Sequence, residues 1–204
     1  MERILIVNGS PRAPRSNSKL YAEAFIKGWR KGAEYMNLTL INRQAIIEKI
    51  GSGAYREVLF VFPLYADGIP STLLSLWKDI EAAGKVPAGT RMSLIVNCGF
   101  YEPTQNEVAI KMARLFAKRA GFDFASSFSI ASGEATPGTI FRHLLYWRLR
   151  RFGRGLRKGR KLTFSYTMPI SKRSFLRAST KFWLAYGARN GIDGKAMSTL
   201  GVEK

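Results

Sequence analysis

Residues 4–18 read ILIVNGSPRAPRSNS and decide the fold of this chain. The apolar run at 4–7 is typical of a buried strand, and it stops at Asn8-Gly9, a pair that favours a turn. After a loop rich in Ser, Pro and Arg, the segment 19–29 is compatible with a helix. The stretch therefore predicts a strand, an anion-binding loop and a helix in succession.

The loop at 9–17 carries the groups that a phosphate needs. Its side-chain donors are Ser10, Arg12, Arg15, Ser16 and Ser18, with Asn17 placed to cap the helix. The first helical turn leaves backbone N–H groups without partners, and the positive end of the helix dipole adds to their attraction for an anion. The spacing matches neither the dinucleotide fingerprint nor a Walker loop. A turn of this composition also occurs without any ligand, so that alternative stays open.

Strand and helix patterns alternate along the chain that follows. Strands are expected at 36–42, 58–62, 93–97 and 124–130, helices at 73–83 and 105–120, and a short connection at 46–55. In the helix at 105–120, the apolar residues Val108, Met112, Leu115 and Phe116 are assigned to one buried face. The alternation predicts an α/β fold, a doubly wound parallel sheet of about five strands in the flavodoxin-like order 2-1-3-4-5.

In such a sheet, ligands bind beyond the carboxyl ends of the strands, where the loops at 9–17, 63–70 and 98–104 meet. In the second loop, PLYADGIP, Gly68 is expected to permit a positive φ and Pro70 to start a helix. The third loop offers Gly99 for close approach and the rings of Phe100 and Tyr101 for stacking. One loop for a phosphate and two for a planar ring indicate a mononucleotide site.

The motifs NGSPR and SNS, PLY with Asp-Gly-Ile-Pro, and NCGFYE resemble those of the NAD(P)H-dependent FMN reductase and flavodoxin-like oxidoreductase family, over residues 3–130. The resemblance implies an enzyme with bound FMN that passes hydride from NAD(P)H through flavin N5 to a small acceptor such as a flavin, a quinone, an azo or a nitro compound. It implies a phosphate site made by Ser10, Arg12, Ser16, Asn17 and Ser18. It implies a ring site made by Pro63, Leu64, Tyr65, Asp67, Gly68, Ile69, Asn97, Gly99, Phe100 and Tyr101.

No side chain is assigned a catalytic role, because the cofactor carries the hydride and the protein supplies orientation and electrostatics. Backbone groups near Asp67 and Gly68 are expected to bond the N5 and O4 edge of the flavin. The resemblance also implies a homodimer. The alternative function is a noncatalytic flavin-binding or membrane-surface protein that works through its basic C-terminal segment.

Composition favours one soluble domain with an appendage, within 204 residues. No signal peptide or membrane span is expected, so a cytoplasmic location is predicted. A single cysteine, Cys98, excludes an intramolecular disulfide and any site built on several cysteines. It is interpreted as a small buried residue or, alternatively, a redox-sensitive thiol. His143 has no second ligand candidate near it, so no metal site is predicted.

The net charge of +19 is concentrated near the C-terminus. Residues 135–192 contain 14 Lys or Arg and no Asp or Glu, which leaves 19 − 14 = +5 for the rest of the chain. Helices are expected at 139–157 and 172–186, with Gly153, Gly155 and Gly159 weakening any continuous helix between them. The predicted boundaries are 1–158 for the FMN-binding domain and 159–204 for a basic, aromatic helical extension packed on it.

Four interpretations of this basic segment remain open. Its cations are either simply solvated or bind an anionic membrane surface, the 2′-phosphate of NADPH, or nucleic acid. Nucleic acid is the weakest of these, because no recognised nucleic-acid motif is present.

Overall fold

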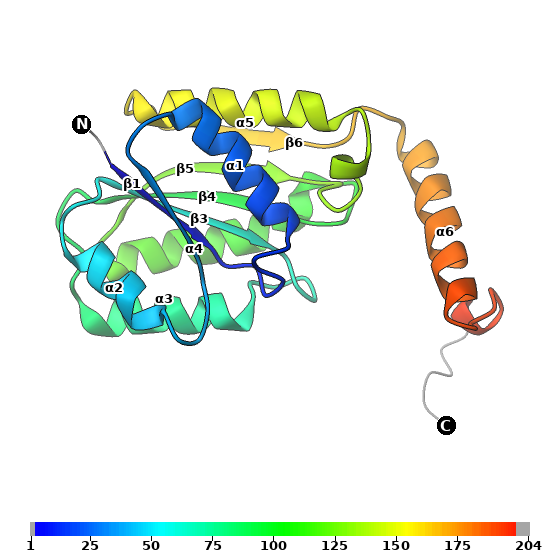
Figure 1. Ribbon diagram of the computed structural model, residues 1–204, viewed down its shortest axis with the longest axis horizontal. Coiled ribbons are helices and arrows are strands. Elements are labelled where there is room, and N and C mark those ends of the chain that lie inside the picture. The colour runs from blue at the N-terminus through cyan, green and yellow to red at the C-terminus, as the bar shows by residue number, and fades with distance from the viewer. Residues whose placement is uncertain (1–2, 199–204) are drawn as a thin grey trace. The chain divides into compact units, whose positions relative to one another are not determined.

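A computed structural model, which describes residues 3–198, contains a six-stranded parallel sheet in the order β2-β1-β3-β4-β5-β6 (Figure 1). The predicted order 2-1-3-4-5 is confirmed, and one further strand pairs with β5. The strands are β1 Ile4–Asn8, β2 Ala33–Asn37, β3 Glu57–Pro63, β4 Arg91–Asn97, β5 Asp123–Ile130 and β6 Thr163–Tyr166.

Helices cover both faces of the sheet. On one face lie α1 Asn17–Trp29 and α5 Arg142–Arg157, and on the other lie α2 Arg43–Gly51, α3 Ser71–Ala83 and α4 Glu107–Ala120. Short 3-10 turns, η1 Pro103–Asn106 and η2 Thr136–Gly138, precede α4 and α5. Because β3 is covered on both faces, its residues from Glu57 to Phe62 are all buried.

Glycines allow α1 and α5 to pack in close contact. A Cβ atom on Gly153 would lie 2.6 Å from the carbonyl oxygen of Phe25, and one on Gly28 would collide with the carbonyl of Arg150. The helix expected at 139–157 is confirmed as α5, which contains Gly153 and Gly155, and in the described segment 158–171 no continuous helix joins it to α6 Lys172–Arg189. The role of these two glycines is to let neighbouring groups approach the helix, which offsets their low helix propensity.

Two other expected elements differ in the structure. The second strand is Ala33–Asn37 and not 36–42, and the expected connection at 46–55 is largely helix α2. Ile46, Ile47 and Ile50 of α2 have helical spacing and pack into the core. The spacing of these three isoleucines therefore indicated a helix. The polar residues at its start and the glycine at its end made the helix hard to recognise.

The buried face of α4 also differs from the prediction. Phe116 is buried as expected, whereas Val108, Met112 and Leu115 are exposed. The alanines at 109, 113, 117 and 120 face the sheet instead, because small side chains let the helix approach it closely. An apolar stripe is therefore left on the outer surface of α4.

The chain divides into two compact units, Met1–Met168 and Pro169–Lys204. The first extends past the predicted boundary at 158, because β6 joins the sheet. The second contains α6 Lys172–Arg189 and the turn η3 Ala196–Ser198. Packing of the extension on the domain stays a prediction, and residues 1–2 and 199–204 lie outside the described residues. Within 3–198, no helix has the length and apolar character needed to cross a bilayer.

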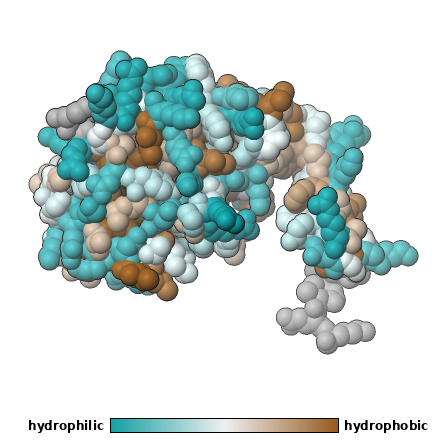
Figure 2. All heavy atoms as spheres, in the orientation of Figure 1, coloured by the Kyte–Doolittle hydropathy of each residue, from teal (hydrophilic) through white to brown (hydrophobic). Residues whose placement is uncertain are grey.

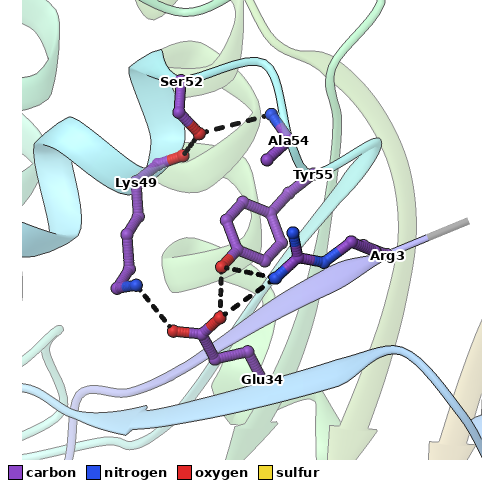
Figure 3. Close-up of polar contacts among 6 residues, drawn as sticks. All are labelled: Arg3, Glu34, Lys49, Ser52, Ala54 and Tyr55. Carbon is purple, nitrogen blue, oxygen red and sulfur yellow. Dashed lines mark hydrogen bonds and ion pairs between the residues drawn. The ribbon is translucent and has the colours of Figure 1, made fainter.

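A polar cluster ties the amino ends of β1 and β2 to α2 (Figure 3). The carboxylate of Glu34 is 2.8 Å from Nζ of Lys49 and 3.4 Å from a guanidinium nitrogen of Arg3, and it accepts a hydrogen bond from the hydroxyl of Tyr55. The Arg3 guanidinium lies 4.8 Å from the centre of the Tyr55 ring. These contacts, led by the hydrogen bond from Lys49, lower the pKa of Glu34.

Candidate functional site

A cleft of about 320 Å³ lies where the loops after β1, β3 and β4 converge. Both polar and apolar groups line it, and its volume is within the range of small-molecule sites. The lining residues are Ser10, Arg12, Arg15, Ser16, Asn17, Ser18, Pro63, Leu64, Tyr65, Ala66, Asn97, Cys98, Gly99 and Glu134. The cleft therefore occupies the switch point that the sheet order predicts.

Asn8, at the buried end of β1, organises the first loop. Its side-chain amide donates to Ser16 Oγ at 3.2 Å and to Tyr35 Oη at 3.0 Å, and its Oδ1 accepts from the backbone N–H of Ser10 at 3.1 Å. These bonds fix both ends of the loop to the sheet. Sequence reasoning treated Asn8 only as a turn former, because its partner Tyr35 comes from another strand.

The N-terminus of α1 opens onto this loop. Ser16, and not the predicted Asn17, is the N-cap, and its hydroxyl accepts from the backbone N–H of Lys19 at 3.3 Å. The backbone N–H groups of Asn17 and Ser18 have no acceptor among residues 3–198. They are free to bind an anion in the cleft. The Asn17 side chain instead donates to the carbonyl of Gly133 at 3.1 Å.

The second loop is a two-residue hairpin. Tyr65 and Gly68 exchange backbone hydrogen bonds of 2.8 and 2.9 Å, and the residues between them, Ala66 and Asp67, have φ of 44° and 58°. The expectation that Gly68 supplies the positive φ was therefore wrong. Positive φ at both central positions is typical of a type I′ turn, in which Gly or Asn is usual. The turn holds the Tyr65 ring, which is exposed, at the rim of the cleft.

The third loop begins in the floor of the cleft. The side-chain amide of Asn97 donates to Ser18 Oγ at 3.1 Å and to the carbonyl of Phe62 at 3.0 Å, which joins β4 to α1 and β3. Cys98 is 3% exposed, and its burial raises the pKa of the thiol. A buried, protonated thiol agrees with the interpretation of Cys98 as a small packing residue.

A fourth loop, which contains Gly133 and Glu134, completes the wall of the cleft. The sequence analysis did not identify this loop. The Nε of Arg12 donates to Tyr65 Oη at 3.0 Å, and its guanidinium lies 3.6 Å from the Glu134 carboxylate. The bond to Tyr65, with the charge of Glu134, raises the pKa of Arg12. Tyr21, buried in α1, donates to the carbonyl of Gly133 and so anchors the loop beneath. No local pattern marks Glu134, because the fold alone brings it to Arg12.

The structure brings most of the predicted site residues together, but not all of them. Ser10, Arg12, Ser16, Asn17, Ser18, Pro63, Leu64, Tyr65, Asn97 and Gly99 line the cleft. Asp67, Gly68, Ile69, Phe100 and Tyr101 do not. Ile69 is a core residue, because the hairpin directs it inward, and Phe100 is exposed. Their roles toward a ligand stay predictions, and His143 is an exposed residue of α5.

Comparison with solved structures agrees with the fold. An FMN-dependent NADH-azoreductase from Bacillus anthracis, in complex with FMN, matches at a TM-score of 0.61 and 16% identity, over 77% of this chain and 100% of that chain. The Trp repressor binding protein from Bacillus subtilis matches at 0.59 and 21%, over 73% and 96%. An NAD(P)H:quinone oxidoreductase from Methanothermobacter marburgensis matches at 0.56 and 16%, over 76% and 98%.

The sheet order and these neighbours define a flavodoxin-like α/β protein. The fold implied by the sequence resemblance is therefore confirmed. No protein-family model matches the chain, and no curated protein does. At identities of 16 to 21% the structural likeness concerns the fold alone.

Proposed function

We propose that this protein is an FMN-dependent oxidoreductase that takes hydride from NAD(P)H and passes it to a small electron acceptor. The observation that carries this proposal is a single cleft lined both by free backbone amides at the start of α1 and by the aromatic side chain of Tyr65. FMN carries a group for each of them, a charged phosphate and a flat ring. Two of the similar structures, an FMN-dependent NADH-azoreductase and an NAD(P)H:quinone oxidoreductase, support the proposal.

The phosphate end of the proposed site is the loop after β1. The amides of Asn17 and Ser18 are the donors, Ser10 and Ser16 add hydroxyl groups, and Arg12 adds a positive charge at the rim. Hydrogen bonds and the helix dipole then act together on a dianion.

The ring end lies between the loops after β3 and β4. Pro63, Leu64 and Tyr65 provide an apolar and aromatic edge, and Gly99 leaves space for close approach. When bound, FMN supplies the hydride-transfer chemistry, and the protein's part is to orient the ring and shield one side from water. The exposed rim at Tyr65 leaves an open side for a nicotinamide and then an acceptor.

The test begins with purified protein reconstituted with FMN, followed by anaerobic addition of NADH or NADPH. Binding by calorimetry and bleaching of the flavin absorbance would support the enzyme. Binding with persistent yellow colour would favour the noncatalytic alternative. No heat of binding with FMN would exclude both the enzyme and the flavin-binding alternative.

Arg12→Ala tests the phosphate end specifically. Loss of a charge-assisted hydrogen bond is expected to weaken FMN binding about tenfold or more, with little change for riboflavin, which lacks the phosphate. Lys27→Ala, which removes an exposed cation in the last turn of α1, is the matched control. An equal loss for both flavins would contradict the proposed orientation.

We also propose that the protein acts as a homodimer in the cytoplasm. The exposed stripe of Val108, Met112 and Leu115 on α4 supports the dimer, since apolar side chains spaced along a helix are typical of an interface. An antiparallel pairing of two α4 helices would bring Glu107 of one copy near Lys118 of the other, as a two-fold axis allows.

A further inference from the structure

The helix α6 carries a large aromatic face that its own unit does not cover. Phe182, Trp183 and Tyr186 are 59%, 49% and 53% exposed, and their rings contact one another at centroid distances of 5.3 to 6.2 Å. Phe175 and Leu176 precede Phe182 and Trp183 by seven residues each, about two helical turns, and so continue the same side of the helix. Figure 2 shows hydrophobic side chains beside hydrophilic ones over this helix. In the described part of its unit, only the short turn η3 accompanies α6.

The opposite side of α6 is basic. Arg173, Arg177 and Lys181 recur every four residues and therefore form one row along the helix. No Asp or Glu occurs from 135 to 192, so nothing on the helix neutralises this row. The helix is amphipathic, with aromatic groups on one side and cations on the other.

The first unit carries the same combination independently, on the outer face of α5. Trp147 is 48% exposed, Leu144 about one turn earlier is also exposed, and the guanidinium of Arg151 lies 4.8 Å from the Trp147 ring centre. A groove at the end of α5 is lined by Arg151, Arg154, Gly155, Lys158, Arg160, Leu162 and Phe164. Within the described residues, none of its four cations forms an ion pair with a carboxylate.

We propose that α6 docks on the surface of an anionic lipid bilayer. Aromatic residues are stabilised at the boundary between headgroups and acyl chains, and Lys and Arg are attracted to anionic headgroups. An amphipathic helix of this kind lies in the interface plane, with its apolar side toward the acyl chains. The inference goes beyond the proposed flavin chemistry and does not require it.

Two other occupants fit these observations less well. Nucleic acid would neutralise the cations but would leave the face formed by Phe182, Trp183 and Tyr186 largely in water. A second α6 helix would cover the aromatic face but would leave both rows of cations in solvent without an acidic partner. An anionic bilayer alone satisfies both sides of the helix.

The experiment is vesicle co-sedimentation of the full-length chain with phosphatidylcholine alone and with a phosphatidylcholine and phosphatidylglycerol mixture. Binding is expected only to the anionic vesicles and should weaken as salt is added. Replacing Arg173, Arg177 and Lys181 by Gln should lower the partition coefficient about fivefold per cation, or about a hundredfold in total. The control has Lys27, Lys78 and Lys85 replaced by Gln, which removes the same number of charges elsewhere. The control should change the partition coefficient by less than about tenfold.

A second variant, Phe182→Ser with Trp183→Ser, removes the apolar side and should also abolish binding to anionic vesicles. Equal sedimentation with both vesicle types, or with neither, would overturn the proposal. Tighter binding to duplex DNA that depends on the same three cations would assign the surface to nucleic acid instead. A dimer that dissociates in this second variant, without any vesicle binding, would assign it to a second copy. FMN binding by each variant, measured separately, distinguishes failure of this proposal from failure of the proposed function.

Discussion

Ala66 and Asp67 hold the turn after β3 in a backbone conformation that is unfavourable for residues with a side chain. Their φ values of 44° and 58° lie in the left-handed region, where each such residue costs about 1–2 kcal/mol. The turn persists because Tyr65 and Gly68 pair on either side of it. It presents Tyr65 at the rim of the cleft, so the strain lies beside the proposed ring site.

Ala66→Val is therefore expected to lower the free energy of unfolding by about 1–2 kcal/mol, since a β-branched residue fits positive φ worse than alanine does. Ala66→Gly is the matched control and should leave it unchanged or raise it by up to about 1 kcal/mol. Urea unfolding of both variants measures the difference. Equal stability of the two would show that the turn has another conformation in solution.

Glu34 gives the protein a specific sensitivity to acid. Its pKa is lower in the folded chain than the ordinary value of 4.5, because Lys49, Tyr55 and Arg3 stabilise the carboxylate. The unfolded chain therefore binds a proton on Glu34 more tightly than the folded chain does. The stabilisation of the folded chain is present above pH 4.5 and is lost as the pH falls through the lowered pKa.

From about pH 5 to about pH 3, the unaltered protein should lose more of its free energy of unfolding than Glu34→Gln does. Glu48→Gln, which alters an exposed carboxylate on α2, is the control and should behave as the unaltered protein. Chemical denaturation at a series of pH values measures the slopes. Parallel slopes for Glu34→Gln and the unaltered protein would contradict the role given to the cluster in Figure 3.

Single residues show where sequence reasoning about the cleft succeeds and where it stops. Ser16 and Tyr65 were predicted because turn residues and aromatics directly follow buried strands. Glu134 was not, because its contact with Arg12 joins segments far apart in the sequence. The same applies to Asn8, whose hydrogen bonds reach a neighbouring strand.

At the scale of elements, the contact between α1 and α5 depends on the absence of a side chain at Gly28. Gly28→Ala is expected to lower the free energy of unfolding by about 2 kcal/mol, since a methyl group would collide with the backbone of Arg150 and overpacking outweighs the gain in helix propensity. Gly138→Ala is the control, because nothing lies within 4 Å of the added atom. Thermal unfolding compares them, and equal melting temperatures would refute the close packing.

The parallel sheet was predictable because continuous apolar runs such as 58–62 and 93–97 indicate strands covered on both faces. The strand β6 was not, since TFSY is short and only partly buried at the sheet edge. The face of α4 was assigned incorrectly because large apolar residues were taken for the core, whereas the alanines pack against the sheet. Hydrophobicity alone does not distinguish a core face from an apolar surface stripe.

For the whole molecule, the stripe on α4 leads to a prediction about assembly. Met112→Glu with Leu115→Glu should convert the proposed homodimer into a monomer, because two carboxylates would be buried at the interface without partners. Ile41→Glu, which alters a fully exposed apolar residue elsewhere, should leave the dimer intact. Light scattering coupled to size-exclusion chromatography measures the mass. A monomeric unaltered protein would rule out the dimer.

The single cysteine has a practical consequence for experiments on this chain. Because Cys98 is shielded and its thiol stays protonated at neutral pH, maleimide reagents should react with it slowly. A second cysteine introduced on α6, as in Ser179→Cys, could then be labelled selectively without removing the native one. A fluorophore at that position would report the polarity around the helix, with no label elsewhere on the protein.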